Sequence, residues 1–595
     1  MEHLLFYRKR QAAFQEELAV LTRRYNAIST ARFAVALVFM ALGYYCFQSA
    51  EITSLVLGMA ACALVFFVLM HYHGKVVQGK KRARTILDIN LDELAFLSGR
   101  QTPFEDGAEF RDITHPYSHD LDIFGSRSLY HSLNRTQSFK GKGKLAEYLS
   151  GNASPEEVIF RREAVKELAA MNGLRQEIMA IGKMNKDSKA NYDRLINWSR
   201  RQEVTFNAAQ RIIAIALPVL LFLFVALRLL TGNGLYTNIA ECIFGANLVF
   251  LLGFLKPVKR ETADTFDIHS IIQGYGQSIR ELENTEFTSQ KLKTLQRILV
   301  DGDNRASSAF LKLSVLFARL DSIFNAFGAI VFNGLFLFHF HVLYALLEWK
   351  KRHAQDIVRW LDAIAEFEAL SSLANFSYNN PGYVFPELND ERIIRFDNLA
   401  HPLMKGEGRV SNNVALAQSF MILTGSNMSG KSTFLRSLGI NMVLGGAGAP
   451  VCASSANIHP MQVLVSMRLS DSLSDNESYF FAEVKRLRFI MERLADGPGF
   501  VLLDEILRGT NSEDKRTGSI KVIEKMVALK AVGAIATHDI EVCNIAGQYP
   551  GKLSNHCFES QIADNELYFD YRLREGICRN KSATFLMEKM GVINR

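Results

Sequence analysis

The hydrophobic positions of this chain gather in long blocks, and the first two blocks follow each other closely. They run from Ala31 to Ala50 and from Ile52 to His71. A helix of about twenty residues is about 30 Å long, which matches the hydrocarbon core of a bilayer. The pattern therefore predicts a transmembrane helical hairpin. A cleaved signal peptide is the alternative, but the charged lead is longer than a usual n-region and a second apolar block follows.

A second pair of apolar blocks lies at Ile212 to Leu230 and at Leu235 to Leu255, with Thr-Gly-Asn-Gly between them. It predicts a second transmembrane hairpin, and a buried hairpin of a soluble domain is the alternative. Glu241 lies inside the fourth block. An acid at the centre of a span costs about 2.5–3.5 kcal/mol on insertion scales, so we expect Glu241 near the membrane interface or facing a partner helix.

Basic residues lie at the outer ends of both predicted hairpins, whereas the turn of the first hairpin carries only Glu51. Segments rich in Lys and Arg stay in the cytoplasm. We therefore expect a multi-pass protein of the inner or plasma membrane, anchored by four transmembrane helices, with both termini and the soluble domains in the cytoplasm. The flanking basic residues are Arg8, Lys9, Arg10, Arg23, Arg24, Lys75, Lys80, Lys81, Arg82, Arg84, Arg200, Arg201, Arg211, Lys256, Lys259 and Arg260.

A fifth apolar block, Ala326 to Trp349, differs from the other four. Asn333, His339, His341 and Glu348 interrupt it, and no basic cluster immediately precedes it. It predicts a buried helix of the soluble part. A fifth span is the alternative, and it would place the C-terminal part of the chain on the opposite side of the membrane.

The remaining sequence divides the chain into five units. Helical periodicity dominates the regions between and after the hairpins, and a turn-rich segment near residues 378–390 precedes a C-terminal domain. The expected units are residues 1–86 (lead and first hairpin), 87–206 (helical core, first part), 207–260 (second hairpin), 261–385 (helical core and lever, second part) and 386–595 (C-terminal domain).

Composition adds little to this division. The seven cysteines among 595 residues are scattered and never form a C-x-x-C pair, so neither a disulfide framework nor a zinc site is indicated. The net charge of +7 is compatible with nucleic acid or anionic lipid as a partner, but it is small for a chain of this length.

The C-terminal domain contains a phosphate-binding loop. Gly425, Gly430, Lys431 and Ser432 satisfy the G-x-x-x-x-G-K-[ST] spacing, between an apolar run typical of a buried strand and a helical segment. Such a loop turns backbone N–H groups onto phosphate oxygens, while its lysine supplies a point charge and its serine can bind Mg²⁺. The predicted nucleotide-binding residues are Gly425, Ser426, Asn427, Met428, Ser429, Gly430, Lys431, Ser432 and Thr433.

Two further predicted strands end in polar residues. The run from Phe500 ends in Asp504 and Glu505, and a later run ends in His538. A parallel strand beside the loop strand would place Asp504 with Ser432 at Mg²⁺ and Glu505 near the attacking water as general base. His538 would reach the γ-phosphate region, so Glu505, His538 and Lys431 are the expected catalytic residues.

These segments together resemble the MutS family of ATPases. The loop carries the family's Asn-Met at Asn427 and Met428, residues 504–514 resemble its Walker B segment, and residues 536–539 resemble its histidine switch. Residues 471–483 are similar to the family's signature segment, in which a serine reaches the nucleotide of the opposite subunit. The resemblance implies that Ser478 is this serine, that ATP and Mg²⁺ are the cofactors, and that the chain forms a homodimer.

The resemblance continues upstream. Residues 120–149 are similar to the start of the family's helical core, and residues 362–383 with 401–403 resemble its junction between lever and ATPase. The implied fold is an α/β P-loop (ABC-type) ATPase domain with an all-α core and lever, to which the two hairpins are added. The mismatch-reading domain has no counterpart, the DNA-gripping clamp is not recognisable, and Val410 to Asn413 offers no ring for the adenine that the family stacks nearby.

The expected function is that of a membrane-anchored MutS-type ATPase that hydrolyses ATP in a composite dimer site and acts on double-stranded DNA. An ABC-type transport or lipid-handling machine is one alternative, but it would carry an L-S-G-G-Q segment and usually more spans. A membrane tether switched by nucleotide is another. A switch needs no general base, so the presence of Glu505 favours hydrolysis.

Overall fold

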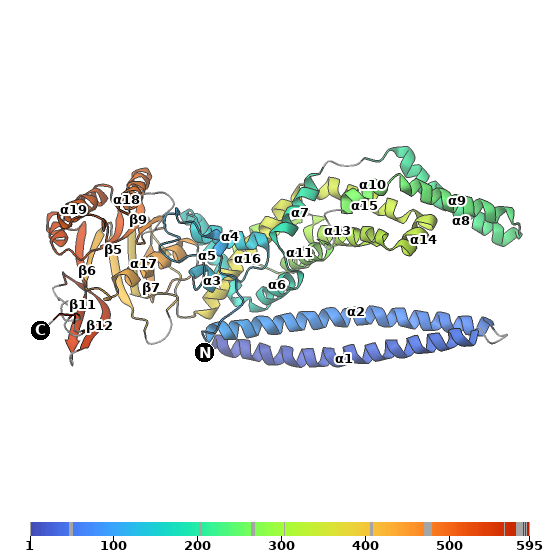
Figure 1. The fold of residues 1–595 in the computed structure, drawn as a ribbon, viewed down its shortest axis with the longest axis horizontal. Helices are drawn as coiled ribbons and strands as arrows, with labels where there is room; N and C mark the ends of the chain where they lie inside the picture. Colours follow the sequence, from blue (N-terminus) through green and yellow to red (C-terminus); the bar gives the residue numbers. More distant parts are fainter. Residues whose placement is uncertain are drawn as a thin grey trace.

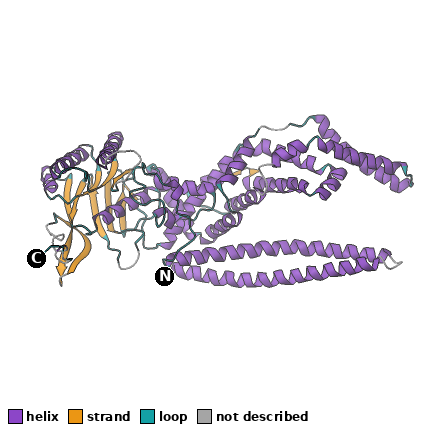
Figure 2. Ribbon diagram, viewed as in Figure 1, coloured by secondary structure: helices purple, strands orange, loops and turns teal. Residues whose placement is uncertain are grey.

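The computed structural model describes residues 2–46, 52–201, 205–262, 268–302, 304–404, 408–468, 479–563, 566–578, 587, 590 and 592–593. The arrangement is elongated (Figure 1): an α/β domain lies at one end, a helical body in the middle, and two helical hairpins point away from the α/β domain. Apart from one short strand pair, the strands belong to the α/β end (Figure 2).

The first hairpin consists of α1 (Glu2–Cys46) and α2 (Ile52–Leu97), which pack side by side. Near its base, Phe14 of α1 and Ile86 and Leu87 of α2 form a small core that also includes Ala180 of α6. Because these apolar residues continue the packing, α2 runs without a break past residue 86, where the sequence predicted a domain boundary.

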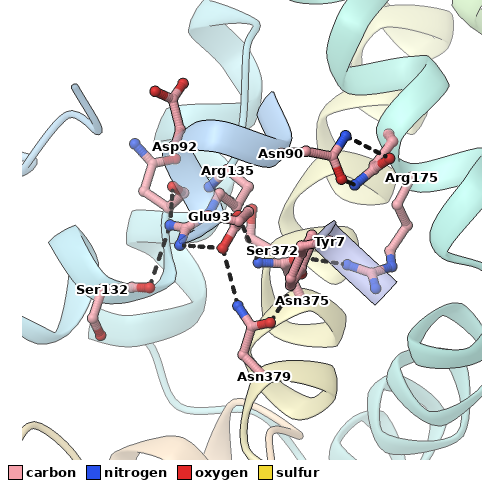
Figure 3. A network of polar contacts seen from close by, with 12 residues as sticks. Tyr7, Asn90, Asp92, Glu93, Ser132, Arg135, Arg175, Ser372, Asn375 and Asn379 are labelled. Carbon is pink, nitrogen blue, oxygen red and sulfur yellow. Dashed lines mark hydrogen bonds and ion pairs between the residues drawn. The ribbon is translucent and has the colours of Figure 1, made fainter. Parts of the chain in front are cut away.

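A buried polar network fastens the base of this hairpin to the long helix α16 (Asp356–Asn379). Figure 3 shows Glu93 of α2 facing Arg135, which donates to both of its carboxylate oxygens. The amides of Asn375 and Asn379 on α16 donate to the same carboxylate, at 3.0 and 3.1 Å. Tyr7 of α1 donates to Asn379 Oδ1 at 2.9 Å, so all three helices meet at one cluster.

The helical body is built around α16, whose apolar side chains pack on α4, α5 and α12 in one continuous core. Serine side chains cap four of its helices, as Ser138 does for α4 by accepting from Gly141 N. Its other elements are η1 (Ala108–Phe110), α3 (Leu129–Leu133), α4 (Phe139–Ser150), α5 (Pro155–Ala170), α6 (Asn172–Asn185), α7 (Lys189–Arg200), α11 (Ile268–Glu283), α12 (Gln290–Leu299), β1 (Val300–Asp301), β2 (Asn304–Arg305), α13 (Ala306–Asp321) and η2 (Ser322–Phe324).

The second hairpin consists of α8 (Ala208–Thr231) and α9 (Leu235–Leu252), followed by the short α10 (Leu255–Thr262). Its tip points in the same direction as the tip of the first hairpin (Figure 1). In the part of the chain that the structure describes, four helices are long and apolar enough to cross a membrane: Glu2–Cys46, Leu55–Leu97, Ala208–Thr231 and Leu235–Leu252. The pair Ala306–Asp321 and Ala326–Phe336, bent by 107°, would add a fifth if it formed one span.

The fifth apolar block does not form the single buried helix that the sequence predicts. It forms α14 (Ala326–Phe336) and α15 (Phe338–His353), separated by Leu337 in a left-handed conformation at φ 48°. The break has a physical cause, because the Asn333 side chain accepts from His339 N at 2.9 Å and so starts the second helix. Helix α15 is largely buried, but Phe327 of α14 is 81% exposed, so the prediction of burial was wrong for the first half of the block.

The α/β domain contains a six-stranded sheet in the order β12-β11-β6-β10-β9-β8 and a four-stranded sheet in the order β3-β7-β4-β5. In the larger sheet, five strands are parallel and β12 pairs antiparallel with β11. The elements are β3 (Glu387–Leu388), β4 (Ile393–Leu399), β5 (Asn412–Ala417), β6 (Phe420–Gly425), α17 (Lys431–Gly446), β7 (Ser455–Ile458), β8 (Gln462–Ser466), α18 (Tyr479–Asp496), β9 (Gly499–Asp504), α19 (Ser512–Ala528), β10 (Val532–Ala536), η3 (Glu541–Gln548), β11 (Leu553–Ala563) and β12 (Glu566–Glu575).

The strand that carries Asp504 and Glu505 is not the neighbour of the loop strand, and that expectation was wrong. β10 lies between β6 and β9 and pairs with both. β10 fits because it is apolar and small: a Cβ at Gly533 would lie 1.9 Å from the Val501 carbonyl oxygen of β9. The carboxyl ends of three parallel strands therefore meet at one edge of the sheet.

The loop around residues 114–122 joins the helical body to the α/β domain. Asp120 accepts from the backbone N–H groups of Met467 and Arg468, at 2.8 and 2.7 Å. Asp122 is paired with Arg468, and Leu121 packs against Gly439 of α17. Because one hydrophobic core runs through both parts, α17 and its loop rest directly on the helical body.

Candidate nucleotide site

The predicted phosphate-binding loop connects β6 to α17, in the strand–loop–helix arrangement that the motif requires. Gly430, at φ 99°, precedes the first helical residue. A Cβ at Gly425 would lie 2.6 Å from Ser429 Oγ and 2.9 Å from the Phe558 carbonyl oxygen, so only glycine fits there. The Oγ atoms of Ser426 and Ser429 are buried and have no hydrogen-bond partner among the described residues.

Lys431 is buried at the start of α17 and turns back into the loop. Its Nζ donates to the carbonyl oxygens of Gly425 and Ser426, at 2.9 and 3.0 Å. Burial lowers the pKa of Lys431, and the carboxylates of Glu505 and Asp504 oppose that effect. The loop thus encloses one ammonium group, as binding to a triphosphate requires.

Ser432 and Asp504 form the expected pair of oxygen ligands. Ser432 Oγ donates to Asp504 Oδ2 at 2.6 Å. The second oxygen, Asp504 Oδ1, is buried and has no hydrogen-bond partner among the described residues. No group of three or more His, Cys, Asp or Glu side chains that could hold a metal is present in the described part of the chain. This pair nevertheless fits Mg²⁺, which takes one or two protein oxygens at nucleotide sites and keeps water and phosphate as its other ligands.

Glu505 and His538 face each other at the same edge. Glu505 Oε1 lies 2.5 Å from His538 Nε2, which in turn lies 3.5 Å from Lys431 Nζ. The hydrogen bond from His538 lowers the pKa of Glu505 to about 2, against the opposing effect of burial. The backbone of Glu505 is left-handed, with φ 51°. Its N–H donates to the carbonyl oxygen of Ala536, the last residue of β10, at 3.0 Å, and this hydrogen bond stabilises the left-handed conformation.

A cavity of about 500 Å³ opens beside the loop. Its lining includes an aromatic ring that no sequence motif predicts, Tyr571 of β12. The Asn412 side chain fixes this strand by donating to the Tyr571 carbonyl oxygen at 3.1 Å and accepting from Leu573 N at 2.7 Å. No local motif marks Tyr571, because its place in the site depends on the pairing of β12 with β11.

The structure thus brings most of the predicted site together. The same cavity is lined by Asn427, Met428, Ser429, Gly430, Lys431, Ser432, Thr433 and Glu505. Ser478 lies outside the described residues, so its role stays a prediction. Helix α18 begins at the next residue, and its Glu483 accepts from Arg508 N at 3.1 Å, just beyond Glu505.

Residues 421–592 match the family model MutS domain V. Human "MutS protein homolog 4" is 30% identical over 256 residues, which are 41% of this chain and 25% of the relative. The Arabidopsis thaliana "DNA mismatch repair protein MSH4" is 31% identical over 33% of this chain and 25% of the relative. The Clostridium beijerinckii "DNA mismatch repair protein MutS" is 32% identical over 36% of this chain and 24% of the relative. The chain spans about a quarter of the length of the curated relatives it matches.

Proposed function

From the match to MutS domain V and the similarity to MutS and MutS homologue 4 proteins, which support membership of the MutS family, we propose a membrane-anchored ATPase. It hydrolyses ATP in a composite site of a homodimer and acts on double-stranded DNA. One observation carries the proposal: Lys431, Ser432, Asp504, Glu505 and His538, from three separate segments, meet at one edge of the sheet.

Each side chain has a distinct task in this mechanism. When ATP binds, the Lys431 ammonium group donates to phosphate oxygens in place of the carbonyl oxygens of Gly425 and Ser426. Ser432 and Asp504 would hold Mg²⁺, which neutralises charge on the phosphates when it is bound. Glu505 accepts the proton of the attacking water, and His538 orients the Glu505 carboxylate through their hydrogen bond.

The two hairpins supply the membrane anchor. Their tips point the same way, so one bilayer can take both (Figure 1). Large apolar side chains near the tips are open to solvent; Leu229 and Leu230 of α8, for example, are 81% and 82% exposed. A soluble protein rarely leaves so much apolar surface uncovered. With basic residues at the outer ends, the α/β domain lies in the cytoplasm and the location is the inner or plasma membrane.

We expect protease protection of the full chain in native membranes to show this orientation. Epitope tags at either terminus or after residue 100 should be cleaved from the cytoplasmic side alone, because basic segments flank both hairpins. A tag inserted between Gly232 and Asn233, at the tip of the second hairpin, should be cleaved only from the far side. Recovery of the protein in the soluble fraction, or any terminal tag on the far side, would contradict the anchor.

The proposed activity is tested with full-length protein in lipid vesicles, by measuring ATP hydrolysis with and without duplex DNA, with or without a mismatch. We expect turnover that rises when DNA is added. Turnover that is indifferent to every DNA would remove DNA as the substrate and favour a nucleotide-driven membrane machine. Nucleotide binding without turnover would favour a membrane tether that is switched by nucleotide.

The proposed dimer leads to a specific prediction for Ser478. Lys431, Ser432 and Asp504 approach the phosphates from one side, so a second chain must cover the other side. Ser478→Ala should lower turnover by about 10²-fold, because it removes one donor to the transition state. Mixing Ser478→Ala with Lys431→Ala chains should restore part of the activity, since each mixed dimer has one intact composite site. Turnover that does not depend on protein concentration, in a protein shown to be a monomer, would exclude a composite site shared by two chains.

Tyr571 is proposed to stack on the nucleotide base. Its ring packs against the loop, because a Cβ at Gly430 would lie 3.0 Å from Tyr571 Cδ1. Base–aromatic stacking contributes about 1–3 kcal/mol, so Tyr571→Ala should weaken ATP binding by about 5- to 150-fold. Tyr571→Phe keeps the ring and is the matched control. Titration with a fluorescent ATP analogue measures both, and equal affinities for the two variants would exclude stacking.

A further inference from the structure

The short helix α14 presents an apolar surface that the soluble part of the protein does not cover. From Ala326 to Phe340 the sequence contains no Asp, Glu, Lys or Arg. Phe327, Ile330 and Phe332 of α14 are 81%, 52% and 53% exposed. Such a group of large exposed side chains marks a surface that contacts another molecule or a lipid phase.

This surface is continuous with the second hairpin. The rings of Phe336 in α14 and Phe222 in α8 lie 5.4 Å apart, centroid to centroid. Gly334 packs so closely on α9 that a Cβ there would lie 2.2 Å from the Phe244 ring. Phe222 and Phe244 lie near the middle of α8 and α9, so α14 meets the hairpin well inside the proposed spans.

The backbone around the break after α14 is hydrogen-bonded within the protein. The Gly334 carbonyl, in the last turn of α14, accepts from the Nδ2 of Asn247, which is fully buried on α9, at 2.7 Å. Asn333 Oδ1 accepts from His339 N, and the first turn is capped by Asn325 Oδ1, which accepts from Gly328 N at 3.2 Å. Water is absent from a bilayer core, so a helix that ends there needs such internal partners.

We propose that α14 inserts into the cytoplasmic half of the bilayer as a re-entrant, non-spanning helix that packs on α8 and α9. Its partner is the acyl chains of the lipid, and the inference rests on the proposed membrane anchoring of the second hairpin. Eleven residues make a helix of about 16 Å, roughly half of the ~30 Å hydrocarbon core, so α14 cannot span it. The chain returns through α15, whose Tyr344 accepts from Arg211 at the start of α8 at 3.2 Å.

The test places nitroxide labels on single cysteines in full-length protein whose seven native cysteines have been replaced. The labelled positions are Phe327→Cys and Ile330→Cys, with Phe332→Cys as the substitute if either variant fails to fold. Leu229→Cys on α8 is the lipid-facing control. Ile113→Cys, an exposed apolar position of the helical body, is the water-facing control. Collision rates with oxygen and with a water-soluble nickel chelate are compared after reconstitution into phosphatidylcholine–phosphatidylglycerol vesicles.

We expect a ratio of oxygen to nickel collisions at Phe327 and Ile330 that is several-fold above the ratio at Ile113 and similar to that at Leu229. A nickel-dominated signal at Phe327 and Ile330 with a lipid signal at Leu229 would overturn the insertion of α14 alone. A nickel-dominated signal at Leu229 as well would overturn the membrane anchor with it. Low collision rates with both reagents at the α14 positions would show a protein contact, which also overturns the proposal.

Discussion

Glu505→Gln should bind ATP as the unaltered protein does and lose about 10²- to 10⁴-fold in turnover, because the amide cannot accept a proton from water. The geometry separates the proposed base from the proposed Mg²⁺ ligands. Glu505 contacts His538, whereas Ser432 donates a hydrogen bond to Asp504. The pKa of Glu505 is about 2, so the carboxylate takes up a proton only as the pH falls toward that value. Above about pH 4 it stays ionised, and it should add no acid limb to the pH profile of turnover.

Two controls make this result interpretable. Glu513→Gln changes an exposed glutamate in the first turn of α19 and should leave turnover unchanged. Lys431→Ala should instead weaken ATP binding by about 2–5 kcal/mol, because the buried ammonium is the charge that the loop encloses. Normal single-turnover hydrolysis by Glu505→Gln would remove it from the role of base, and weak ATP binding by that variant would assign it to binding.

The sequence predicted the parts of the site that short motifs mark. The loop from Gly425 to Thr433 lies between a strand and a helix, as its motif implies, and Ser432 meets Asp504 as expected. These predictions succeed because glycine spacing and strand-end carboxylates are each set by a few neighbouring residues. Tyr571 was missed because a strand pairing far from the motif brings it to the site.

The sequence also did not predict the order of the strands or the exposure of α14. A run of apolar residues predicts that β9 is buried but does not name its neighbours, so β10 was not expected between β9 and β6. In the block from Ala326 to Trp349, α14 is the more apolar helix and is open, whereas α15, which contains His341 and Glu348, is largely buried. Burial depends on which elements pack against a helix, and hydrophobicity alone does not contain that information.

The buried pair of Glu93 and Arg135 should be the most sensitive point of the helical body. Their side chains are only 2% and 4% exposed, and Glu93 also accepts from Asn375 and Asn379 of α16 (Figure 3). Removing one partner of a buried ion pair typically costs about 3–5 kcal/mol, because the other charge is left without compensation. Glu93→Ala should therefore loosen the base of the first hairpin and the C-terminal half of α16.

Hydrogen exchange measured by mass spectrometry reports this change locally, without requiring the whole membrane protein to unfold reversibly. A loss of 3–5 kcal/mol corresponds to exchange about 10²- to 10⁴-fold faster in peptides from the end of α2 and from residues 370–379. Asp88→Ala is the matched control, because Asp88 lies on the same helix and forms an exposed pair with Arg84. An exposed pair contributes about 0–1 kcal/mol, so exchange in this variant should barely change.

A double variant separates lost charge compensation from lost packing. Glu93→Leu together with Arg135→Met replaces both charges with apolar side chains, and buried pairs replaced in this way often keep their stability. We expect this variant to regain most of the protection that Glu93→Ala loses. The Asn375 and Asn379 amides would still lose one acceptor each, which limits the recovery.

Because residues 380–386 lead directly from α16 to the first strand of the α/β domain, the cluster links the membrane hairpin to the ATPase. If Glu93→Ala exchanges no faster than Asp88→Ala, the first hairpin is not held to α16 through this cluster.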